Sequence, residues 1–267
     1  MVSFAVHGLP LLGTLLLWFV STALIVWLDS RPRETFPISL TVGGMLALAG
    51  VAVIDSTGTD TSAGAAYWSA AAALAVWGWH EMSFLMGVVT GPRRLPCPPE
   101  VSGWQRFRLA TATVIHHEVA LAATGVLLFA LTWGEPNQAG AEVFAMLFVL
   151  RLSTKFNIFA GVPNFSPELL PAHLSYLHGY FRRGPAGPLF AVTLALSAAL
   201  AWWFGRAALA DGSEGDVAAA TLLGGLALLG VIEHLFLALP LRDAALWLWA
   251  SKSRDANTSV APATGIE

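Results

Sequence analysis

Residues 11–28 read LLGTLLLWFVSTALIVWL, a run without any charged side chain. The hydrocarbon core of a bilayer is about 30 Å thick, and an α-helix needs about 20 mostly apolar residues to cross it. The run is therefore long enough to span a membrane. It follows no basic segment and is longer than the apolar part of a cleavable signal sequence, so it predicts a helix that the protein retains.

The composition of the whole chain indicates a membrane environment. Of the 267 residues, 56% are hydrophobic and only 12% are charged, whereas a soluble domain carries about 25% charged residues. The 11 tryptophans suit aromatic anchors at both membrane interfaces. A net charge of −3 leaves no large basic surface, which excludes nucleic acid as a partner. Cys97 is the one cysteine, so neither an intrachain disulfide nor a cysteine-based metal site can form.

Seven apolar stretches approach the required length and predict an all-α, polytopic transmembrane bundle. The predicted helices are roughly Leu11–Leu28, Phe36–Ile54, Ala65–Val89, Phe107–Trp133, Ala139–Phe159, Gly187–Leu209 and Val217–Leu239. They form one domain over residues 1–251. The further segment Pro167–Phe181 is too short and polar to cross the bilayer, but its aromatic residues predict an interfacial helix at the cytoplasmic face.

The short loops alternate in charge along the chain. Basic residues follow the first, third, fifth and seventh predicted helices: Arg31, Arg33, Arg93, Arg94, Arg106, Arg108, Arg182, Arg183, Arg242, Lys252 and Arg254. The other loops are acidic, with Arg206 as their sole cation. Because Lys and Arg are retained on the cytoplasmic side, we expect a bacterial inner-membrane protein with a periplasmic N-terminus. Residues 252–267 are expected to form a disordered cytoplasmic tail. Residues 90–94, TGPRR, suggest either a contact with lipid phosphates or a plain structural loop.

Ionisable residues form compact groups within the predicted helices. Six of the seven histidines fall in the groups His80-Glu81, His116-His117-Glu118, Glu233-His234 and the interfacial pair His173 and His178. The first three groups lie about 9 to 13 Å from the cytoplasmic ends of their helices, at about 1.5 Å per residue. Carboxylates at such depth are costly unless they are paired, neutralised or bound to a metal. The sequence therefore predicts one functional site in the cytoplasmic half of the bilayer.

Two interpretations of these groups compete. The predicted metal ligands are His80, Glu81, His116, His117, Glu118, Glu233 and His234. Imidazole and carboxylate together suit non-haem iron, manganese or zinc, and the set is large enough for a dinuclear centre. The Glu-x-x-His pairs of ferritin-like diiron proteins and the histidine boxes of membrane desaturases are both absent. In the alternative interpretation, Arg151 and Lys155 neutralise two of the three glutamates, and the histidines form hydrogen bonds between helices.

A pigment is another predicted ligand of this region. Trp77 and Trp79 flank His80 and could stack on a flat macrocycle, although ordinary helix packing is the alternative role for both. His173 and His178 lie on the interfacial segment, which would cover the site as a lid. An imidazole could hold bacteriochlorophyll transiently through its magnesium ion.

Three long segments carry a resemblance to a known family: WGWHEMSFLMGVVTGPRR (residues 77–94), with the HHE group that follows, NFSPELLPAHLSYLHGYFRR (residues 164–183) and EHLFLALPLRDAALWLW (residues 233–249). The chain resembles the PuhE family over roughly residues 5–250. These are photosynthetic complex assembly proteins encoded beside the reaction-centre H subunit in purple phototrophic bacteria. The resemblance implies a multispanning inner-membrane protein that supports formation of the reaction centre with its core antenna and influences bacteriochlorophyll supply. It supplies no catalytic residues.

Two functions therefore stand as hypotheses. The first is an assembly factor without turnover, with reaction-centre and core-antenna subunits or pigment-synthesis proteins as partners besides the lipid bilayer. The second is a membrane-embedded enzyme with a dinuclear His/Glu metal centre that acts on a tetrapyrrole or another lipophilic substrate. Transport is less well supported, because no ionisable residues line the periplasmic half of the bundle.

Overall fold

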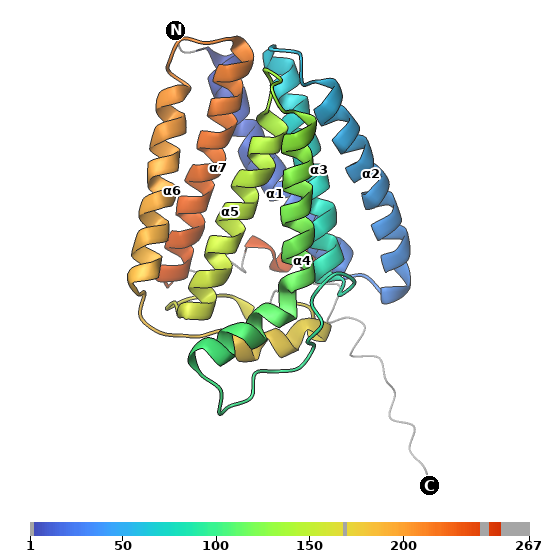
Figure 1. Ribbon diagram of the computed structural model, residues 1–267, viewed down its shortest axis with the longest axis vertical. Coiled ribbons are helices and arrows are strands. Elements are labelled where there is room, and N and C mark those ends of the chain that lie inside the picture. The colour runs from blue at the N-terminus through green and yellow to red at the C-terminus, as the bar shows by residue number, and fades with distance from the viewer. Residues whose placement is uncertain (1–2, 168–169, 241–245, 252–267) are drawn as a thin grey trace.

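The structure, a computed structural model, describes residues 3–167, 170–240 and 246–251. The described chain is helical and has no strands (Figure 1). Its long helices are α1 (Leu9–Asp29), α2 (Phe36–Ser56), α3 (Ala63–Leu85), α4 (Gly103–Leu131), α5 (Ala139–Ala160), α6 (Pro188–Ala207) and α7 (Glu214–Ala238). Shorter helical segments are η1 (Phe4–Gly8), η2 (Arg33–Thr35), η4 (Ala172–Tyr180) and α8 (Leu248–Ser251).

Every predicted apolar stretch forms a long helix, but α3 ends earlier than expected, at Leu85 rather than Val89. The cause is Gly87, whose φ of 77° places it in the left-handed region just beyond the helix. The amide of Val88 donates to the carbonyl of Ser83 at 2.9 Å, and the amide of Gly87 donates to that of Phe84 at 2.9 Å. This pair of bonds is a Schellman motif, which satisfies the last carbonyls of a helix.

Six of the helices are long and apolar enough to cross a membrane: α1 together with η1, α2 together with η2, α4, α5, α6 and α7. Large apolar side chains on their outer faces, such as Leu48 and Val126, expose 74% and 71% of their surface, as lipid-facing residues do. The chain is thus a multi-pass membrane protein. The seventh stretch, α3, is not among the six, because its second half contains the polar residues His80 and Glu81.

The helix α3 nevertheless lies at the centre of the bundle. It contacts α1, α2, α4, α5 and α7, and it runs between the same two ends as these helices (Figure 1). The neighbouring helices shield its polar side chains, since His80 and Glu81 are both buried. A transmembrane helix that packs against protein on several sides does not need the hydropathy of a lipid-facing helix.

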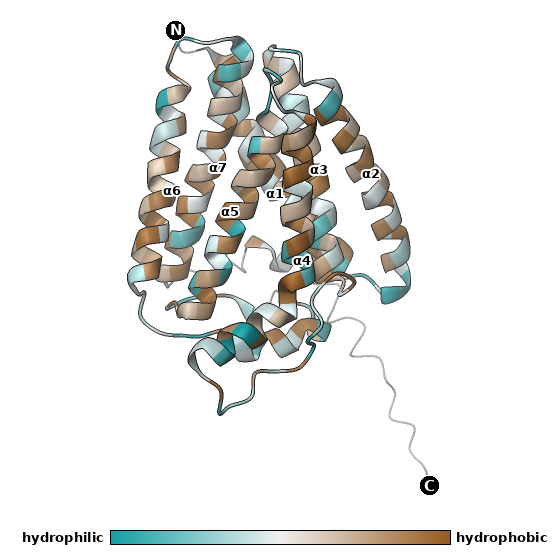
Figure 2. Ribbon diagram, viewed as in Figure 1, coloured by the Kyte–Doolittle hydropathy of each residue, from teal (hydrophilic) through white to brown (hydrophobic). Residues whose placement is uncertain are grey.

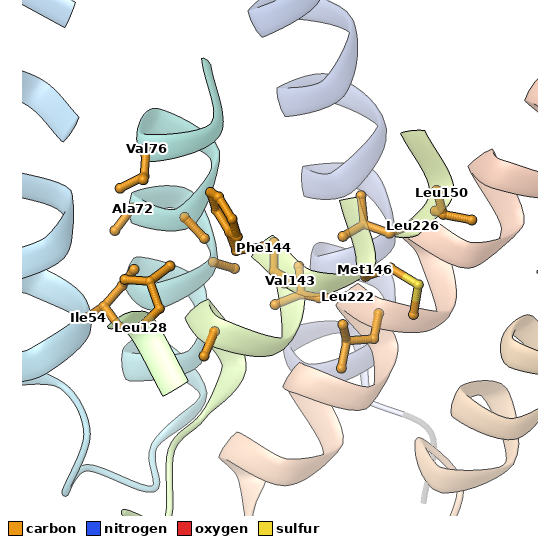
Figure 3. Packing of buried hydrophobic residues seen from close by; sticks show 14 of the residues in the cluster. Ile54, Ala72, Val76, Leu128, Val143, Phe144, Met146, Leu150, Leu222 and Leu226 are labelled. Atoms are coloured by element: carbon orange, nitrogen blue, oxygen red, sulfur yellow. The ribbon is translucent and has the colours of Figure 1, made fainter. Parts of the chain in front are cut away.

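The half of the bundle that contains the start of α3 has an apolar core. Ile54, Leu128 and Phe144, from α2, α4 and α5, are completely buried there (Figure 3). The amide of Gly140 donates to the hydroxyl of Ser69 at 3.0 Å, which brings the backbone of α5 against α3. Small residues permit this close approach, as is typical of transmembrane helix contacts. We call this region the apolar half.

The other half, which we call the polar half, contains a bend in α4. The loop after α3 inserts against α4 at this bend, where a Cβ atom added to Gly91 would lie 2.5 Å from the carbonyl carbon of Thr113. The amide of His117 donates to the carbonyl of Thr90 at 3.0 Å, and the amide of Arg93 donates to the carbonyl of Ala112 at 3.1 Å. These bonds replace part of the internal ladder of α4, which explains its visible change of direction (Figure 1).

The two ends of the bundle differ in charge. The loops beyond the polar half carry Arg31, Arg33, Arg93, Arg94, Arg182 and Arg183, and we call this the arginine-rich end. The opposite end carries Asp55, Asp60, Glu135, Asp211, Glu214 and Asp216, in its loops and in the adjoining turns of α2 and α7. Figure 2 shows hydrophilic colour at both ends and apolar colour along most of the helices between them. That the arginine-rich end faces the cytoplasm is a prediction from the distribution of basic residues.

The segment that was predicted to be an interfacial helix lies at the arginine-rich end. It contains η4, a 3-10 helix, and buries Leu174, Leu177 and Tyr180. Leu174 and Leu177 pack against Phe84 at the end of α3. The predicted disordered tail, residues 252–267, lies outside the described residues.

Candidate functional site

Four helices bring six charged or titratable side chains together in the polar half. We call this set the ionic cluster; its members are Glu81, His117, Glu118, Arg151, Lys155 and Glu233. They come from α3, α4, α5 and α7. Figure 2 shows hydrophilic segments that interrupt the apolar colour of α5 and α7 in this half. The sequence predicted that His80, Glu81, His117, Glu118, Glu233 and His234 converge, and it offered Arg151 and Lys155 as partners of the glutamates in the alternative interpretation.

The shortest contact in the ionic cluster joins α4 to α5. The Lys155 ammonium donates to Glu118 Oε1 at 2.6 Å, and the two side chains expose 23% and 14% of their surface. The same ammonium lies 5.6 Å from the ring centre of Phe84, within cation–π range. Lys155 is therefore held by one carboxylate and one aromatic ring.

A second cation, Arg151, lies between two carboxylates. Its Nη2 is 3.7 Å from Glu81 Oε2, and its Nη1 is 4.0 Å from Glu233 Oε1. Arg151 and Lys155 are one helical turn apart on α5, so both reach the same side of the helix. This spacing lets α5 neutralise carboxylates from α3, α4 and α7 together.

His117 occupies the centre of the ionic cluster and is completely buried. Its Nε2 lies 3.8 Å from Glu81 Oε1, and its ring packs on Phe84 with centroids 4.7 Å apart. Among the described residues, neither ring nitrogen has a hydrogen-bond partner, and neither do Glu81 Oε1 and Glu118 Oε2. Buried polar atoms are usually satisfied, so this spot has capacity for a water molecule, a shared proton or another polar guest.

The remaining buried histidines form hydrogen bonds between helices. His80 Nε2 lies 2.9 Å from the hydroxyl of Thr124, which joins α3 to α4. His234 Nε2 lies 2.8 Å from the hydroxyl of Ser153, and its Nδ1 lies 2.7 Å from the carbonyl of Gly230. These contacts match the structural alternative for the histidines.

Other predicted site residues lie away from the ionic cluster. His116 faces outward from α4, and His178 is exposed near Phe181. His173 Nε2 lies 2.7 Å from the carbonyl of Leu85, at the arginine-rich end. The structure therefore does not bring these histidines together with Glu81 and Glu118.

Both predicted macrocycle-stacking tryptophans are used in helix packing. The ring of Trp77 meets Phe144 edge-on, with centroids 5.5 Å apart. Trp79 Nε1 donates to the carbonyl of Leu40 at 3.1 Å, and its ring lies against Gly44 of α2. Packing, the alternative role, accounts for the position of both rings.

The contacts present in the polar half are those of the ionic interpretation, in which Arg151 and Lys155 face the glutamates. In the part of the chain that the structure describes, no group of three or more His, Cys, Asp or Glu side chains lies close enough to hold a metal ion. Two cations instead separate the three glutamates. Of the predicted ligands, only Glu81 and His117 face each other closely, and a metal there would need further donors.

The sequence did not indicate the roles that several residues have in this region. Thr124 and Ser153 bind the histidines, and Thr90 and Gly91 bend α4 so that His117 turns inward. The hydroxyl residues could have been suggested by their depth, which is similar to that of the histidines. Nothing in the sequence indicated that the loop after α3 would bond to the middle of α4.

Comparison with known proteins identifies the family of this chain. The model of a family described as "Protein of unknown function (DUF3623)" matches residues 4–258. The chain belongs to the DUF3623 family. A relative from Rhodobacter capsulatus, described as "Uncharacterized 30.4 kDa protein in puhA 5'region", is 36% identical over 261 residues, which cover 95% of each chain. No solved structure matches. The relative's description agrees with a protein of the puh region, although it does not use the PuhE name.

Proposed function

We propose that this protein is an integral membrane factor that supports assembly of the photosynthetic reaction centre with its core antenna and influences bacteriochlorophyll supply. The observation that carries the proposal is the relative in the puhA 5′ region, which is 36% identical over 95% of the chain. The resemblance of residues 77–94, 164–183 and 233–249 to the PuhE family points in the same direction. Multi-pass membrane character suits a factor that works on membrane-embedded complexes.

The ionic cluster supports an assembly factor without turnover rather than a metalloenzyme. Arg151 and Lys155 contact all three of its carboxylates, and His80 and His234 are hydrogen-bonded between helices. A polar network of this kind holds transmembrane helices in one arrangement. A rigid scaffold can hold a subunit or a pigment without making or breaking a bond.

Deletion and complementation in a purple phototroph test the proposed function. A strain without the gene should contain less core complex, measured by the near-infrared absorption of its membranes, and the wild-type gene should restore it. Normal amounts of core complex in the deletion strain would contradict the proposal.

Glu233→Gln is the informative variant, because Glu233 shares Arg151 with Glu81 and its side chain is 40% exposed. We expect near-normal protein abundance, because Arg151 keeps its contact with Glu81, and reduced core complex, because the scaffold then loses the contact that joins α5 to α7 through Glu233.

Two further measurements separate the assembly factor from the enzyme. Metal analysis of the purified protein should find no stoichiometric iron, manganese or zinc, whereas about two ions per chain would favour a dinuclear centre. The pigments of the Glu233→Gln strain should show no discrete tetrapyrrole precursor. Accumulation of one precursor would favour an enzyme that consumes it.

A further inference from the structure

A small cavity lies at the arginine-rich end, separate from the ionic cluster. It has a volume of about 160 Å³ and lies between η2, the start of α2, the loop after α3, and η4. Its polar lining comes from Arg33, Thr90, Arg94, His173 and Tyr176, and apolar side chains complete it. We call it the Arg33/Arg94 pocket.

The charged groups that line the pocket are all basic. Arg33 and Arg94 line it together with His173, and no described carboxylate is among the lining residues. The guanidinium of Arg94 donates through Nη2 to the carbonyl of Gly87 at 3.1 Å, which fixes its position beside the loop. Guanidinium groups favour phosphate and carboxylate, to which they can donate two parallel hydrogen bonds. The pocket is therefore suited to an anion.

Two buried hydroxyl groups add unused hydrogen-bonding capacity. Thr90 Oγ1 and Tyr176 Oη are both buried and have no hydrogen-bond partner among the described residues. Thr90 is only 2% exposed, and its carbonyl accepts from the amide of His117, so its backbone is held in place. Unsatisfied buried polar groups call for an explanation. A ligand oxygen that accepts from these hydroxyls would supply one.

Size and depth narrow the choice of ligand. Pockets for drug-sized molecules have volumes of about 300 to 1,000 Å³, so a cavity of about 160 Å³ takes a single small group and not a tetrapyrrole. Phe36 begins α2 and Met86 directly follows α3, which places the cavity where two helices leave the apolar layer. Lipid phosphates are expected at the level where helices leave the apolar layer, and basic pockets between transmembrane helices bind anionic headgroups.

We propose that the Arg33/Arg94 pocket binds a phosphate group, with Arg33 and Arg94 neutralising its charge and Thr90 and Tyr176 donating to its oxygens. The apolar lining from Phe36, Met86 and Leu174 suits the carbon atoms attached to that phosphate. The phosphate comes either from an anionic phospholipid headgroup or from free phosphate in solution. This binding site does not depend on the proposed role in assembly.

Calorimetric titration of the purified full-length protein in detergent tests the site. The probes are a short-chain phosphatidylglycerol, a phosphatidylcholine with the same chains, and inorganic phosphate. Wild-type protein should bind phosphatidylglycerol more tightly than phosphatidylcholine. Arg33→Gln should weaken this binding about tenfold, and Thr90→Val should weaken it about threefold, as expected for one charged and one hydroxyl donor.

The variants are chosen to preserve the fold. Arg33 is exposed, and Thr90→Val keeps the shape of the side chain while it removes a hydroxyl that has no partner in the described structure. Arg108→Gln is the matched control, because Arg108 is an exposed cation near the same end that does not line the pocket. It should bind phosphatidylglycerol as the wild type does. If Thr90→Val fails to fold, Arg33→Gln decides the test.

Each outcome has a defined meaning. Phosphatidylglycerol binding that Arg33→Gln weakens supports a lipid as the source of the phosphate. Binding of inorganic phosphate alone, weakened by the same variant, supports free phosphate at the same site. The proposal is overturned if neither phosphatidylglycerol nor inorganic phosphate binds the wild type. It is also overturned if Arg33→Gln binds these probes as tightly as Arg108→Gln does.

Discussion

The apolar half and the polar half of the bundle hold the same helices together by different means. In the apolar half, α3 and α5 touch through Ser69 and Gly140, and large residues such as Phe144 fill the remaining space. In the polar half, the same two helices are joined through Glu81 and Arg151. The helix α4 is regular in the first region and bent in the second (Figure 1).

This difference shows where the molecule can accommodate a ligand or a change of shape. The contact of Gly140 with Ser69 and Ile54 has one arrangement, because it leaves no space even for a Cβ atom. The polar half contains atoms with unused hydrogen-bonding capacity, namely His117, Glu81 and Glu118 in the ionic cluster and Thr90 and Tyr176 in the Arg33/Arg94 pocket. Interactions of buried, unsatisfied polar groups are therefore expected in the polar half. The opposite end has a larger hollow of about 290 Å³, but it lies in the acidic loop region around Glu135 and Asp216, outside the close-packed contact of α3 with α5.

The largest expected effect follows from breaking the shortest ion pair. Glu118→Gln removes the charge that faces Lys155 at 2.6 Å, and loss of one partner of a buried pair costs about 3 to 5 kcal/mol. We expect protein abundance in membranes, measured by immunoblot, to fall severely. The double variant Glu118→Gln with Lys155→Met should recover much of the abundance. Normal abundance of the single variant together with lost function would instead indicate a catalytic or ligand-binding role for Glu118.

The next largest effect concerns the glycine contact in the apolar half. A Cβ atom at Gly140 would lie 2.8 Å from Ile54 Cγ1 and 2.9 Å from the backbone oxygen of Ser69. Gly140→Ala should therefore lower the free energy of unfolding by about 1 to 3 kcal/mol, the usual cost of overpacking. Denaturation in mixed detergent measures it.

Gly13→Ala is the control for the glycine contact, because a Cβ atom there meets nothing within 4 Å. This variant should be neutral or slightly stabilising, since alanine is the better helix former. Equal destabilisation by both substitutions would contradict the close contact at Gly140.

A smaller effect is expected from a single interhelical hydrogen bond in the polar half. Ser153→Ala removes the partner of His234 Nε2, which lies 2.8 Å from the hydroxyl. Such bonds in membrane proteins contribute about 0.6 kcal/mol on average, so unfolding in mixed detergent should shift only slightly. A loss of stability as large as that expected for Glu118→Gln would show that His234 contributes as much to stability as the members of the ionic cluster do.

Reporter fusions in the loops perturb the protein least. They test which half of the bundle faces the cytoplasm. A reporter after Arg94, in the loop at the arginine-rich end, should be active in the cytoplasm. A reporter after Gly58, at the opposite end, should be active in the periplasm, because basic loops are retained inside. The reverse pattern would invert the bundle and would move the ionic cluster to the periplasmic half.

Most helices of the bundle could be predicted, because the length of an apolar stretch can be counted in the sequence without knowledge of its neighbours in the fold. The stretch of residues 11–28 needs no partner to identify it as a membrane helix, and the same holds for most of the other spans. The end of α3 was mispredicted, because Gly87 lies within a run whose hydropathy continues to Val89. A backbone conformation stopped the helix, and hydropathy does not report that conformation.

The candidate site was predictable in position but not in pairing. Helical rise placed His80, His117 and Glu233 at a similar depth, and the charges of Arg151 and Lys155 suggested a possible neutralisation. The sequence could not show that Lys155 would contact Glu118, or that Arg151 would contact both Glu81 and Glu233. These outcomes depend on the rotation of each helix.

By itself, the sequence determined that the chain enters a bilayer, how many long helices it forms, and that its charges separate toward two ends, because each of these follows from the solvation of local segments. Only the tertiary structure decided which charges meet and where a small anion could bind. The bond between the His117 amide and the Thr90 carbonyl is the clearest example. It bends α4, turns His117 toward Glu81, and holds Thr90 against the Arg33/Arg94 pocket, and it depends on two segments that only the packed bundle brings into contact.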